Sequence, residues 1–176
     1  MDPSRPHRNR IDRSPRTVVG VDVDPWRDDV TYIEPDEAVR TSDVLVCAMD
    51  LNDASRGYFT IDRLRPAKRG AVFVNVSRGE ISPTTHLTTL LDEGVLGGVG
   101  LDAFDGEQEL GAALRAGRGP EGEEARAAVA LMGRHDVVLT PHNAFNTEEA
   151  VDRKSEHSIR SLMDFRSGGA FTWPVS

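Results

Sequence analysis

The stretch Gly70-Ala71-Val72-Phe73-Val74-Asn75-Val76 is a continuous apolar run with one asparagine in it. Apolar side chains fall on both faces of such a segment when it is extended, as a strand covered on both faces requires. Helix-like stretches lie on either side of the run, at 61–68 and 84–93. A strand between helices of roughly ten residues is typical of a parallel sheet with crossover helices. The segment therefore predicts an α/β fold.

The same alternation continues from this run toward both ends of the chain. Four more apolar runs are expected strands, at 18–22, 43–47, 98–104 and 137–141. Three more helix-like stretches lie at 35–40, 125–132 and 147–166. We expect an incomplete, Rossmann-type doubly wound parallel sheet, a loop over most of 105–136 and a C-terminal helix. That last helix is predicted to bury an apolar face made of Ala150, Val151, Ile159, Leu162, Met163 and Phe165.

Composition limits the class of protein. The chain has 176 residues, 38% hydrophobic and 28% charged, which is compatible with one ordinary globular domain. Its net charge of −8 argues against a nucleic-acid partner, because phosphate neutralisation needs a basic surface. The sequence shows neither a signal peptide nor a run of about 18 apolar residues, so we expect a cytoplasmic protein with no membrane partner.

Residues 1–16 differ from the rest of the chain, because they hold five arginines and almost no apolar side chains. A nucleic-acid-binding arm and a solvated, disordered tail both fit this run, and its composition favours the tail.

The cysteine and histidine content leads us to expect neither an intrachain disulfide nor a metal site. Cys47 is the only cysteine, so no intrachain disulfide can form, and its apolar surroundings favour a core thiol over a nucleophile. One cysteine cannot build a structural zinc site, and the five histidines follow no ligand spacing. We therefore expect no metal.

Two charged side chains that follow predicted strands suit a nucleotide and an acid. Asp22 closes the strand 18–22, where an acidic residue of a doubly wound fold accepts hydrogen bonds from the adenosine ribose. Asp24 is the neighbouring candidate, and an ordinary acidic loop is the alternative for both. Arg78 follows the run 70–76, and its planar guanidinium can hold a carboxylate and polarise the adjacent carbonyl. A surface salt bridge is the alternative for Arg78.

Carboxylates and a histidine follow the next two predicted strands. Asp102, Asp105 and Glu107 are close together in sequence, and His142 follows the last strand. A carboxylate beside an imidazole fixes its tautomer and favours acid–base chemistry near neutral pH. A lone histidine is more often structural. However, the carboxyl ends of parallel strands form one ligand-binding edge, where Arg78, Glu107 and His142 would converge.

Four motifs then resemble one known family in their order and rough spacing. They are Ser42-Asp43-Val44, Asn75-Val76-Ser77-Arg78-Gly79, Gly100-Leu101-Asp102-Ala103-Phe104 and Leu139-Thr140-Pro141-His142. From about residue 17 onward the chain resembles the NAD-binding portion of the D-isomer-specific 2-hydroxyacid dehydrogenases, which include D-lactate and phosphoglycerate dehydrogenase-like enzymes. The segment from Thr140 to Val151 looks like the D-lactate dehydrogenase branch. The resemblance implies hydride transfer between NAD(H) and a small 2-hydroxy or 2-oxo acid.

The resemblance assigns three residues to the reaction. Arg78 would bind the carboxylate and carbonyl oxygen of the substrate. His142 would give a proton to the carbonyl as hydride arrives, and remove it in the reverse direction. Glu107 would keep His142 protonated at neutral pH.

The resemblance also implies contacts to NAD. Asp22 would bind the ribose, and Met49 and Asp50 would line the adenine side, although Asp50 replaces a proline common in the family. Ser55, in the following loop, is a further candidate. The residues implied beside the nicotinamide are Val76, Ser77, Arg78 and Asp102.

One part of the family pattern is missing from this sequence. Relatives have a strand and a Gly-x-Gly-x-x-Gly loop before the strand that ends in Asp22, whereas no glycine precedes Gly20 here. In the order 3-2-1-4-5-6 the missing strand would lie between 18–22 and 43–47, so 43–47 is expected to have a bare apolar edge. We expect a tail (1–16), a partial NAD-binding domain (17–146) and a C-terminal helix and tail (147–176).

The sequence is compatible with two functions. The first is a truncated NAD-dependent oxidoreductase that binds NAD poorly and has impaired activity. The second is a non-catalytic dimerisation or regulatory module derived from the family. The presence of Arg78, Glu107 and His142 favours the first, and the missing glycine loop favours the second. A homodimer is a family expectation in either case.

Overall fold

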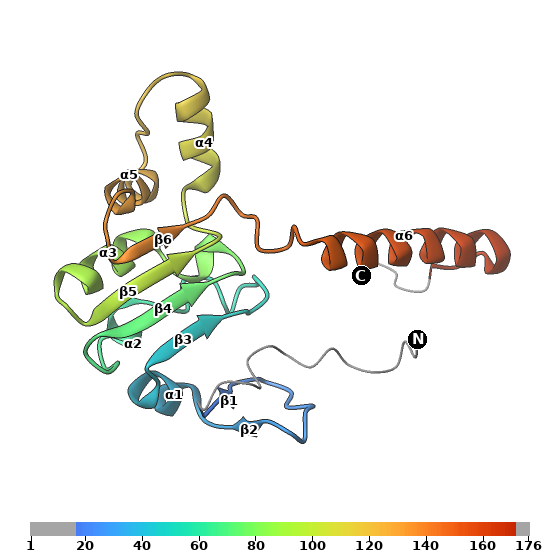
Figure 1. Cartoon of the computed structure of the whole chain (residues 1–176), viewed down its shortest axis with the longest axis horizontal. Coiled ribbons are helices and arrows are strands. Elements are labelled where there is room, and N and C mark those ends of the chain that lie inside the picture. Colours follow the sequence, from blue (N-terminus) through green and yellow to red (C-terminus); the bar gives the residue numbers. More distant parts are fainter. Residues whose placement is uncertain (1–16, 172–176) are drawn as a thin grey trace.

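The computed structural model of the chain describes residues 17–171 (Figure 1). Its strands are β1 (Val19–Gly20), β2 (Thr31–Tyr32), β3 (Val44–Cys47), β4 (Ala71–Asn75), β5 (Leu96–Leu101) and β6 (Val137–Leu139). Its helices are α1 (Pro35–Thr41), α2 (Ile61–Leu64), the 3-10 turn η2 (Gly79–Ile81), α3 (Thr84–Asp92), α4 (Glu107–Arg115), α5 (Glu123–Leu131) and α6 (Glu148–Gly168). The predicted tail at 1–16 lies outside the described residues.

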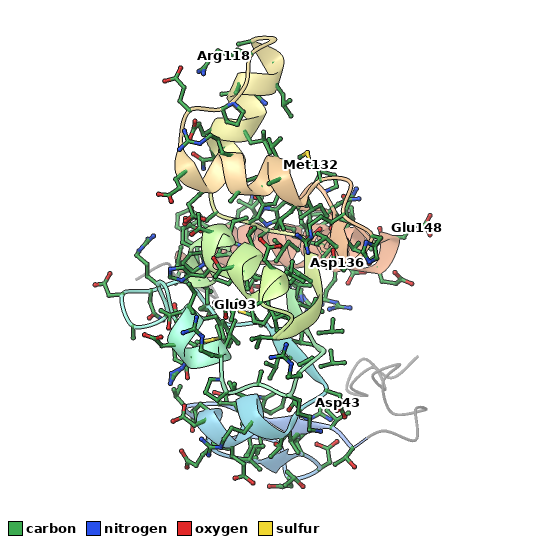
Figure 2. The ribbon with its side chains drawn as sticks, turned by 90° about the vertical axis from the view of Figure 1, so that its left-hand side faces the viewer. Asp43, Glu93, Arg118, Met132, Asp136 and Glu148 are labelled. Carbon is green, nitrogen blue, oxygen red and sulfur yellow. The ribbon has the colours of Figure 1, made fainter. Side chains whose placement is uncertain are left out.

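The strands form two parallel sheets. β3, β4, β5 and β6 pair in that order, and β1 pairs with β2. The β1–β2 pair lies beyond β3 in Figure 1, and Figure 2 shows Asp43, just before β3, at the same end of the larger sheet. This arrangement confirms the α/β fold with an incomplete doubly wound sheet. The sequence does not predict β2, because two residues carry no periodic pattern.

The core lies on one face of the larger sheet. α3 packs on β5, and α2 and α5 pack on α3. Phe73, in the middle of β4, is fully buried in this core together with Leu87 and Leu90 of α3. Cys47 is 1% exposed, which confirms that it is a core thiol.

The opposite face of the sheet is uncovered within residues 17–171. Val44 and Val46 on β3 are 45% and 62% exposed, and Val138 on β6 is 65% exposed. The prediction of strands covered on both faces is therefore wrong for this face. This face is uncovered because of the topology of the larger sheet. The crossovers from β3 to β4, β5 and β6 all progress in one direction, and right-handed crossovers of that kind place their helices on one side.

The segment 105–136 contains a helix that the sequence did not predict. α4 begins after Gly106, which has a φ of 81°, and it buries Leu110 and Ala113. The carboxylate of Glu109 then accepts hydrogen bonds from the backbone N–H groups of Glu121 and Gly122, which fixes the connection to α5. The glycines and charges of this segment resembled a loop, but the spacing of its two buried residues is helical.

The C-terminal helix is present, but its predicted buried face is not buried. α6 has no buried residue, and it extends away from the sheet in Figure 1. The prediction of a buried face on this helix is therefore wrong, because the described residues offer no surface that covers its apolar side chains. None of the helices in 17–171, α6 included, is long and apolar enough to cross a membrane.

Candidate functional site

The turn after β4 is held by a buried asparagine. Asn75 is 0% exposed, and its amide nitrogen donates to the carbonyl oxygen of Arg78 at 2.9 Å and to the hydroxyl of Ser82 at 2.7 Å. Its amide oxygen accepts from the backbone N–H of Ser77 at 2.9 Å and from the Ser77 hydroxyl at 3.0 Å. All polar atoms of the Asn75 side chain are therefore used to shape the turn that carries Arg78.

Gly79 fixes this turn against the end of β5. A Cβ atom at position 79 would lie 2.0 Å from the carbonyl carbon of Phe104 and 2.3 Å from the backbone nitrogen of Asp105. Only hydrogen fits at such a distance, so glycine lets the two chain segments touch. The contact places Arg78, the neighbour of Gly79, beside the segment that leads into Glu107.

The loop that carries His142 is wrapped around the carboxylate of Asp102. One carboxylate oxygen accepts from the Thr140 hydroxyl at 2.6 Å and from the Asn143 backbone N–H at 2.7 Å. The other oxygen accepts from the Ala144 backbone N–H at 2.8 Å. Within the loop, His142 donates its backbone N–H to the carbonyl of Thr140 and has a φ of 52°, an uncommon value for a residue other than glycine. The Asp102 clamp thus holds a locally unfavourable backbone in place.

The imidazole of His142 lies beside the carboxylate of Glu107. The distance from Nδ1 of His142 to Oε2 of Glu107 is 3.4 Å, and the two side chains are 34% and 36% exposed. The ring of Phe145 lies edge-on to the imidazole, with centroids 6.2 Å apart. Nε2 is the imidazole nitrogen remaining for a reactant. A half-exposed imidazole next to a carboxylate is an arrangement that can exchange a proton with a bound molecule.

The three neighbouring carboxylates have three different surroundings. Asp102 clamps the His142 loop, and Glu107 faces the imidazole. Asp105 accepts from the backbone N–H of Gly106 at 2.9 Å, and burial, with a contribution from Glu124, raises its pKa. The residue pattern alone does not say which of the three lies beside the histidine, and only the family resemblance indicated Glu107. The structure places Glu107 there, at the first residue of α4 rather than at a strand end.

The residues predicted near the nicotinamide lie along the ends of β4 and β5. Val76 and Arg78 are exposed, whereas Ser77 is half-buried and its hydroxyl is 3.2 Å from the Cys47 sulfur. Asp102 is 5% exposed, and its two oxygens are already engaged by the loop. Its role in this structure is to position His142.

The residues predicted near the adenine and ribose are spread over other parts of the molecule. Asp22 follows β1 in the smaller sheet, is exposed and accepts from the backbone N–H of Asp24 at 3.1 Å. Met49 packs against the core, and Asp50 is exposed. The buried hydroxyl of Ser55 donates to the Asp50 carbonyl oxygen at 2.6 Å, so this serine shapes its own loop.

The described residues fit only part of a dinucleotide. An exposed carboxylate after β1 suits a ribose, and the exposed residues after β4 suit a planar ring beside Arg78. A pyrophosphate needs a glycine turn that points backbone N–H groups at it from a helix N-terminus. In residues 17–171, no glycine with a positive φ lies between β1 and β3 in the sequence. Within that same part of the chain, no three His, Cys, Asp or Glu side chains gather as a metal site.

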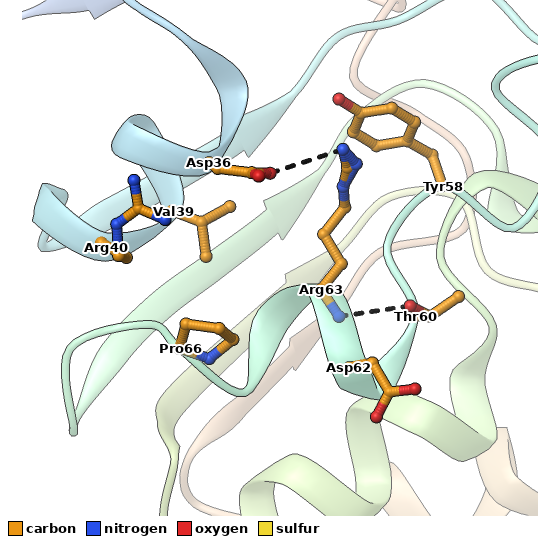
Figure 3. Close-up of a pocket in the computed structure, with 8 residues that line it drawn as sticks. All are labelled: Asp36, Val39, Arg40, Tyr58, Thr60, Asp62, Arg63 and Pro66. Carbon is orange, nitrogen blue, oxygen red and sulfur yellow. Dashed lines mark hydrogen bonds and ion pairs between the residues drawn. The ribbon is translucent and has the colours of Figure 1, made fainter.

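A hollow of about 420 Å³ lies between α1 and α2, away from these residues (Figure 3). The guanidinium of Arg63 stacks on the ring of Tyr58, 4.0 Å from its centroid, and one nitrogen is 3.5 Å from an oxygen of Asp36. Because the arginine is held by these two groups, we interpret the hollow as a feature of helix packing.

Asn75, Gly79 and Thr140 were not predicted as site residues, although all three lie in the motifs. Asn75 could have been found because it is the one polar side chain inside an otherwise apolar strand. Gly79 and Thr140 carry no comparable signal, because their roles depend on contacts with residues far away in sequence.

The Asp102 clamp leads to a prediction for acidic pH. Burial raises the pKa of Asp102, but hydrogen bonds from Thr140, Ala144 and Asn143 outweigh it, so the pKa lies below its usual value. A carboxyl with a lowered folded-state pKa stabilises the fold above its unfolded value of about 4, and loses this effect as the pH falls through the folded value. We expect the amide protons of Asn143 and Ala144 to exchange faster in that range, as measured by NMR. An Asp102→Asn variant should exchange them rapidly even at neutral pH, and unchanged protection in that variant would contradict the clamp.

In parallel α/β sheets of the doubly wound type, ligands bind beyond the carboxyl ends of the strands, which is where Arg78 and His142 lie in the sequence of this chain. Residues 12–144 match the family model of the D-isomer specific 2-hydroxyacid dehydrogenase, NAD binding domain. The chain belongs to this family, and NAD is the cofactor of the family's domain.

Relatives and solved structures agree with this assignment. The D-lactate dehydrogenase of Streptococcus pyogenes is 29% identical over 171 residues, which cover 90% of this chain and 48% of that protein. The glyoxylate reductase of Pyrococcus furiosus is 30% identical over 137 residues, 78% of this chain and 36% of that protein. The structure of D-lactate dehydrogenase from Aquifex aeolicus, complexed with NAD and lactic acid, matches with a TM-score of 0.75 and 25% identity over 88% of this chain and 49% of that one. The chain thus spans half or less of the length of each of these proteins.

Proposed function

We propose that the chain carries the substrate- and proton-handling part of an NAD-dependent D-2-hydroxyacid dehydrogenase. The observation that carries this proposal is the 3.4 Å approach of His142 to Glu107 at the edge where β5 and β6 end. In the proposed reaction, His142 donates a proton from Nε2 to the carbonyl oxygen of a small 2-oxo acid and takes it back in the reverse direction. NAD, when bound, supplies the group that accepts or donates hydride. Glu107 holds the imidazole through Nδ1 and stabilises its charged form.

Arg78 is proposed to bind the carboxylate of the 2-oxo acid. Its Nη1 donates to the carbonyl oxygen of Ser77 at 2.9 Å, which orients an otherwise exposed guanidinium. A guanidinium offers two parallel N–H groups to a carboxylate, so it fixes the orientation as well as the charge of the acid. The buried Asn75 behind it makes this turn rigid. Arg78 and His142 would then act on neighbouring atoms of one small molecule.

The chain is proposed to bind NAD weakly in isolation, because the described residues hold no turn for its pyrophosphate. The alternative function is a non-catalytic dimerisation or regulatory module. Within residues 17–171 the outer edge of β3 is unpaired, and this favours the alternative, since an edge of this kind pairs readily with another chain. Turnover that depends on particular site residues would distinguish the enzyme from the non-catalytic module.

The direct test is NADH oxidation by the purified 176-residue chain with pyruvate, hydroxypyruvate or glyoxylate. We expect slow turnover at high enzyme and NADH concentrations. An Arg78→Lys variant should raise the KM for the 2-oxo acid about 10- to 100-fold, because a point charge replaces a bidentate pair. Arg56→Lys is the matched control, since this exposed arginine lies in the loop after β3, and it should leave the KM unchanged. Absence of turnover above the protein-free rate would contradict the enzymatic proposal and favour the non-catalytic module.

A further inference from the structure

Three helices begin close to one another beside the candidate site. α5 packs against both α3 and α4 (Figure 1). α3 follows the turn that carries Arg78, and α4 begins with Glu107, whose carboxylate faces His142. Contacts among the first turns of these helices therefore reach both parts of the site. The residue at the centre of these contacts is Glu124, in the first turn of α5.

The carboxylate of Glu124 caps α3. Pro83 precedes this helix and forms no side-chain hydrogen bond to it. Instead, Oε1 of Glu124 accepts from the Thr85 hydroxyl at 2.7 Å, and Oε2 accepts from the Thr85 backbone N–H at 3.1 Å. The first N–H groups of a helix have no partner within it, and the helix dipole favours a negative charge there. Glu124 thus joins the first turn of α5 to the first turn of α3.

The backbone of Glu124 lies against the turn that leads into α4. A Cβ atom at Gly106 would lie 3.0 Å from the carbonyl carbon of Glu124 and 2.5 Å from the backbone nitrogen of Ala125. Ala125 is fully buried, so this contact is closed to solvent. Gly106 is directly followed by Glu107. The direction in which α4 leaves the turn is therefore fixed by the contact of the turn with α5.

Thr84 links α3 to the connection between β5 and α4. This threonine is fully buried, and its hydroxyl donates to the carbonyl oxygen of Asp105 at 3.2 Å. Burial, together with the charge of Glu124, raises the pKa of Asp105, which agrees with a carboxyl group packed among these elements. Because the starts of α3, α4 and α5 contact one another, breaking the bonds between Glu124 and Thr85 should let the start of α4 move.

We propose that Glu124 is a positioning residue for the pair formed by Glu107 and His142. It acts through Gly106 and the first turn of α4, and it takes no part in proton transfer itself. Its effect on catalysis rests on the proposed function, whereas its effect on the geometry of the pair does not depend on turnover. The two effects are therefore measured separately.

The geometry of the pair is measured by NMR in the absence of NAD and substrate. The signal is the nuclear Overhauser effect (NOE) between the Hε1 proton of His142 and the methylene protons of Glu107. We expect this NOE in the unaltered chain, because Nδ1 of His142 lies 3.4 Å from Oε2 of Glu107. Glu124→Ala removes both bonds to Thr85 and should abolish the NOE. Circular dichroism would verify that the variant keeps the fold.

Two further variants make this test specific. Glu124→Gln keeps an oxygen for the Thr85 hydroxyl but places an NH2 group where the Thr85 N–H needs an acceptor, so a weaker NOE should remain. Glu123→Ala removes the neighbouring, exposed carboxylate from the same turn of α5, and it should leave the NOE unchanged.

The effect on catalysis is measured by NADH oxidation with a 2-oxo acid. Glu124→Ala should lower kcat about 10- to 100-fold, because a displaced proton donor is less often in the reactive geometry. The KM should stay within about threefold, because the buried Asn75 holds the Arg78 turn independently of α5. Glu124→Gln should recover part of the rate, and Glu123→Ala should keep all of it.

Three outcomes would overturn the proposal. They are an unchanged NOE in folded Glu124→Ala, equal measurable kcat values for Glu124→Ala and Glu123→Ala, and a rise in KM as large as the fall in kcat. The last would mean that the whole site is disordered in the variant. Absence of turnover in the unaltered chain would contradict the proposed function instead, and the NOE series would then decide this inference by itself.

Discussion

Gly79→Ala is expected to destabilise the domain by at least about 3 kcal/mol, because the added methyl group must displace backbone rather than a flexible side chain. The nearest atoms to the new Cβ would be the carbonyl carbon of Phe104 at 2.0 Å and the backbone nitrogen of Asp105 at 2.3 Å. These atoms belong to the segment that follows β5, one of the two central strands of the larger sheet. The turn after β4 and the start of α4 would have to separate, and native domains have only about 5–15 kcal/mol to lose.

Urea denaturation followed by circular dichroism measures this loss. Gly119→Ala is the matched control, because a Cβ atom at that position would meet nothing within 4 Å. The control should change the free energy of unfolding by no more than about 0.5 kcal/mol. If the two alanine variants unfold at the same urea concentration, the close contact between the Arg78 turn and residues 104–105 is not present in solution.

His142→Gln is expected to lower turnover of 2-oxo acids by about 100- to 10,000-fold, the usual range for loss of a general acid. Glutamine keeps a similar size and a hydrogen-bonding amide but cannot give up a proton at neutral pH. The KM for the acid should change much less, because carboxylate binding is assigned to Arg78. Stopped assays of NADH oxidation at high enzyme concentration would provide both parameters.

His135→Gln is the control for this substitution. His135 is exposed and precedes β6, whereas His142 follows it, so the two histidines lie at opposite ends of one strand. The control variant should keep the full rate. Turnover that survives in His142→Gln would show that another group handles the proton, and it would remove the main support for the proposed function.

The elements of the larger sheet could be predicted from the sequence because each strand lies in a continuous apolar run between more polar, helix-like segments. The run 70–76 contains β4, and the other runs place β3, β5 and β6 within a few residues. α2 is shorter than predicted because Pro66 lacks the N–H that a continuing helix needs. α4 was missed because its two buried residues are surrounded by glycine and charge.

The positions of the candidate site residues along the chain could also be predicted, but most contacts among these residues could not. Strand ends place Arg78 and His142 on one edge by topology alone. The choice of Glu107 over Asp105 as the partner of His142 came from the family resemblance, since the residue pattern does not show where Gly106 turns the chain into α4. The use of Asp102 as a loop clamp depends on backbone N–H groups of Asn143 and Ala144, which are invisible in a sequence pattern. The uncovered stripe of α6 follows from what packs against the helix, which amphipathic spacing does not report.

The central proposal is that residues 17–171 hold the acid–base part of a dehydrogenase site but no turn that binds the pyrophosphate of NAD. Isothermal titration of the purified 176-residue chain with NADH tests it most directly. We predict binding no tighter than about 1 mM, since residues 21–43, which connect β1 to β3, contain no glycine for a phosphate-binding turn. A dissociation constant in the micromolar range would contradict it, because the described residues would then have to form a complete dinucleotide site by themselves.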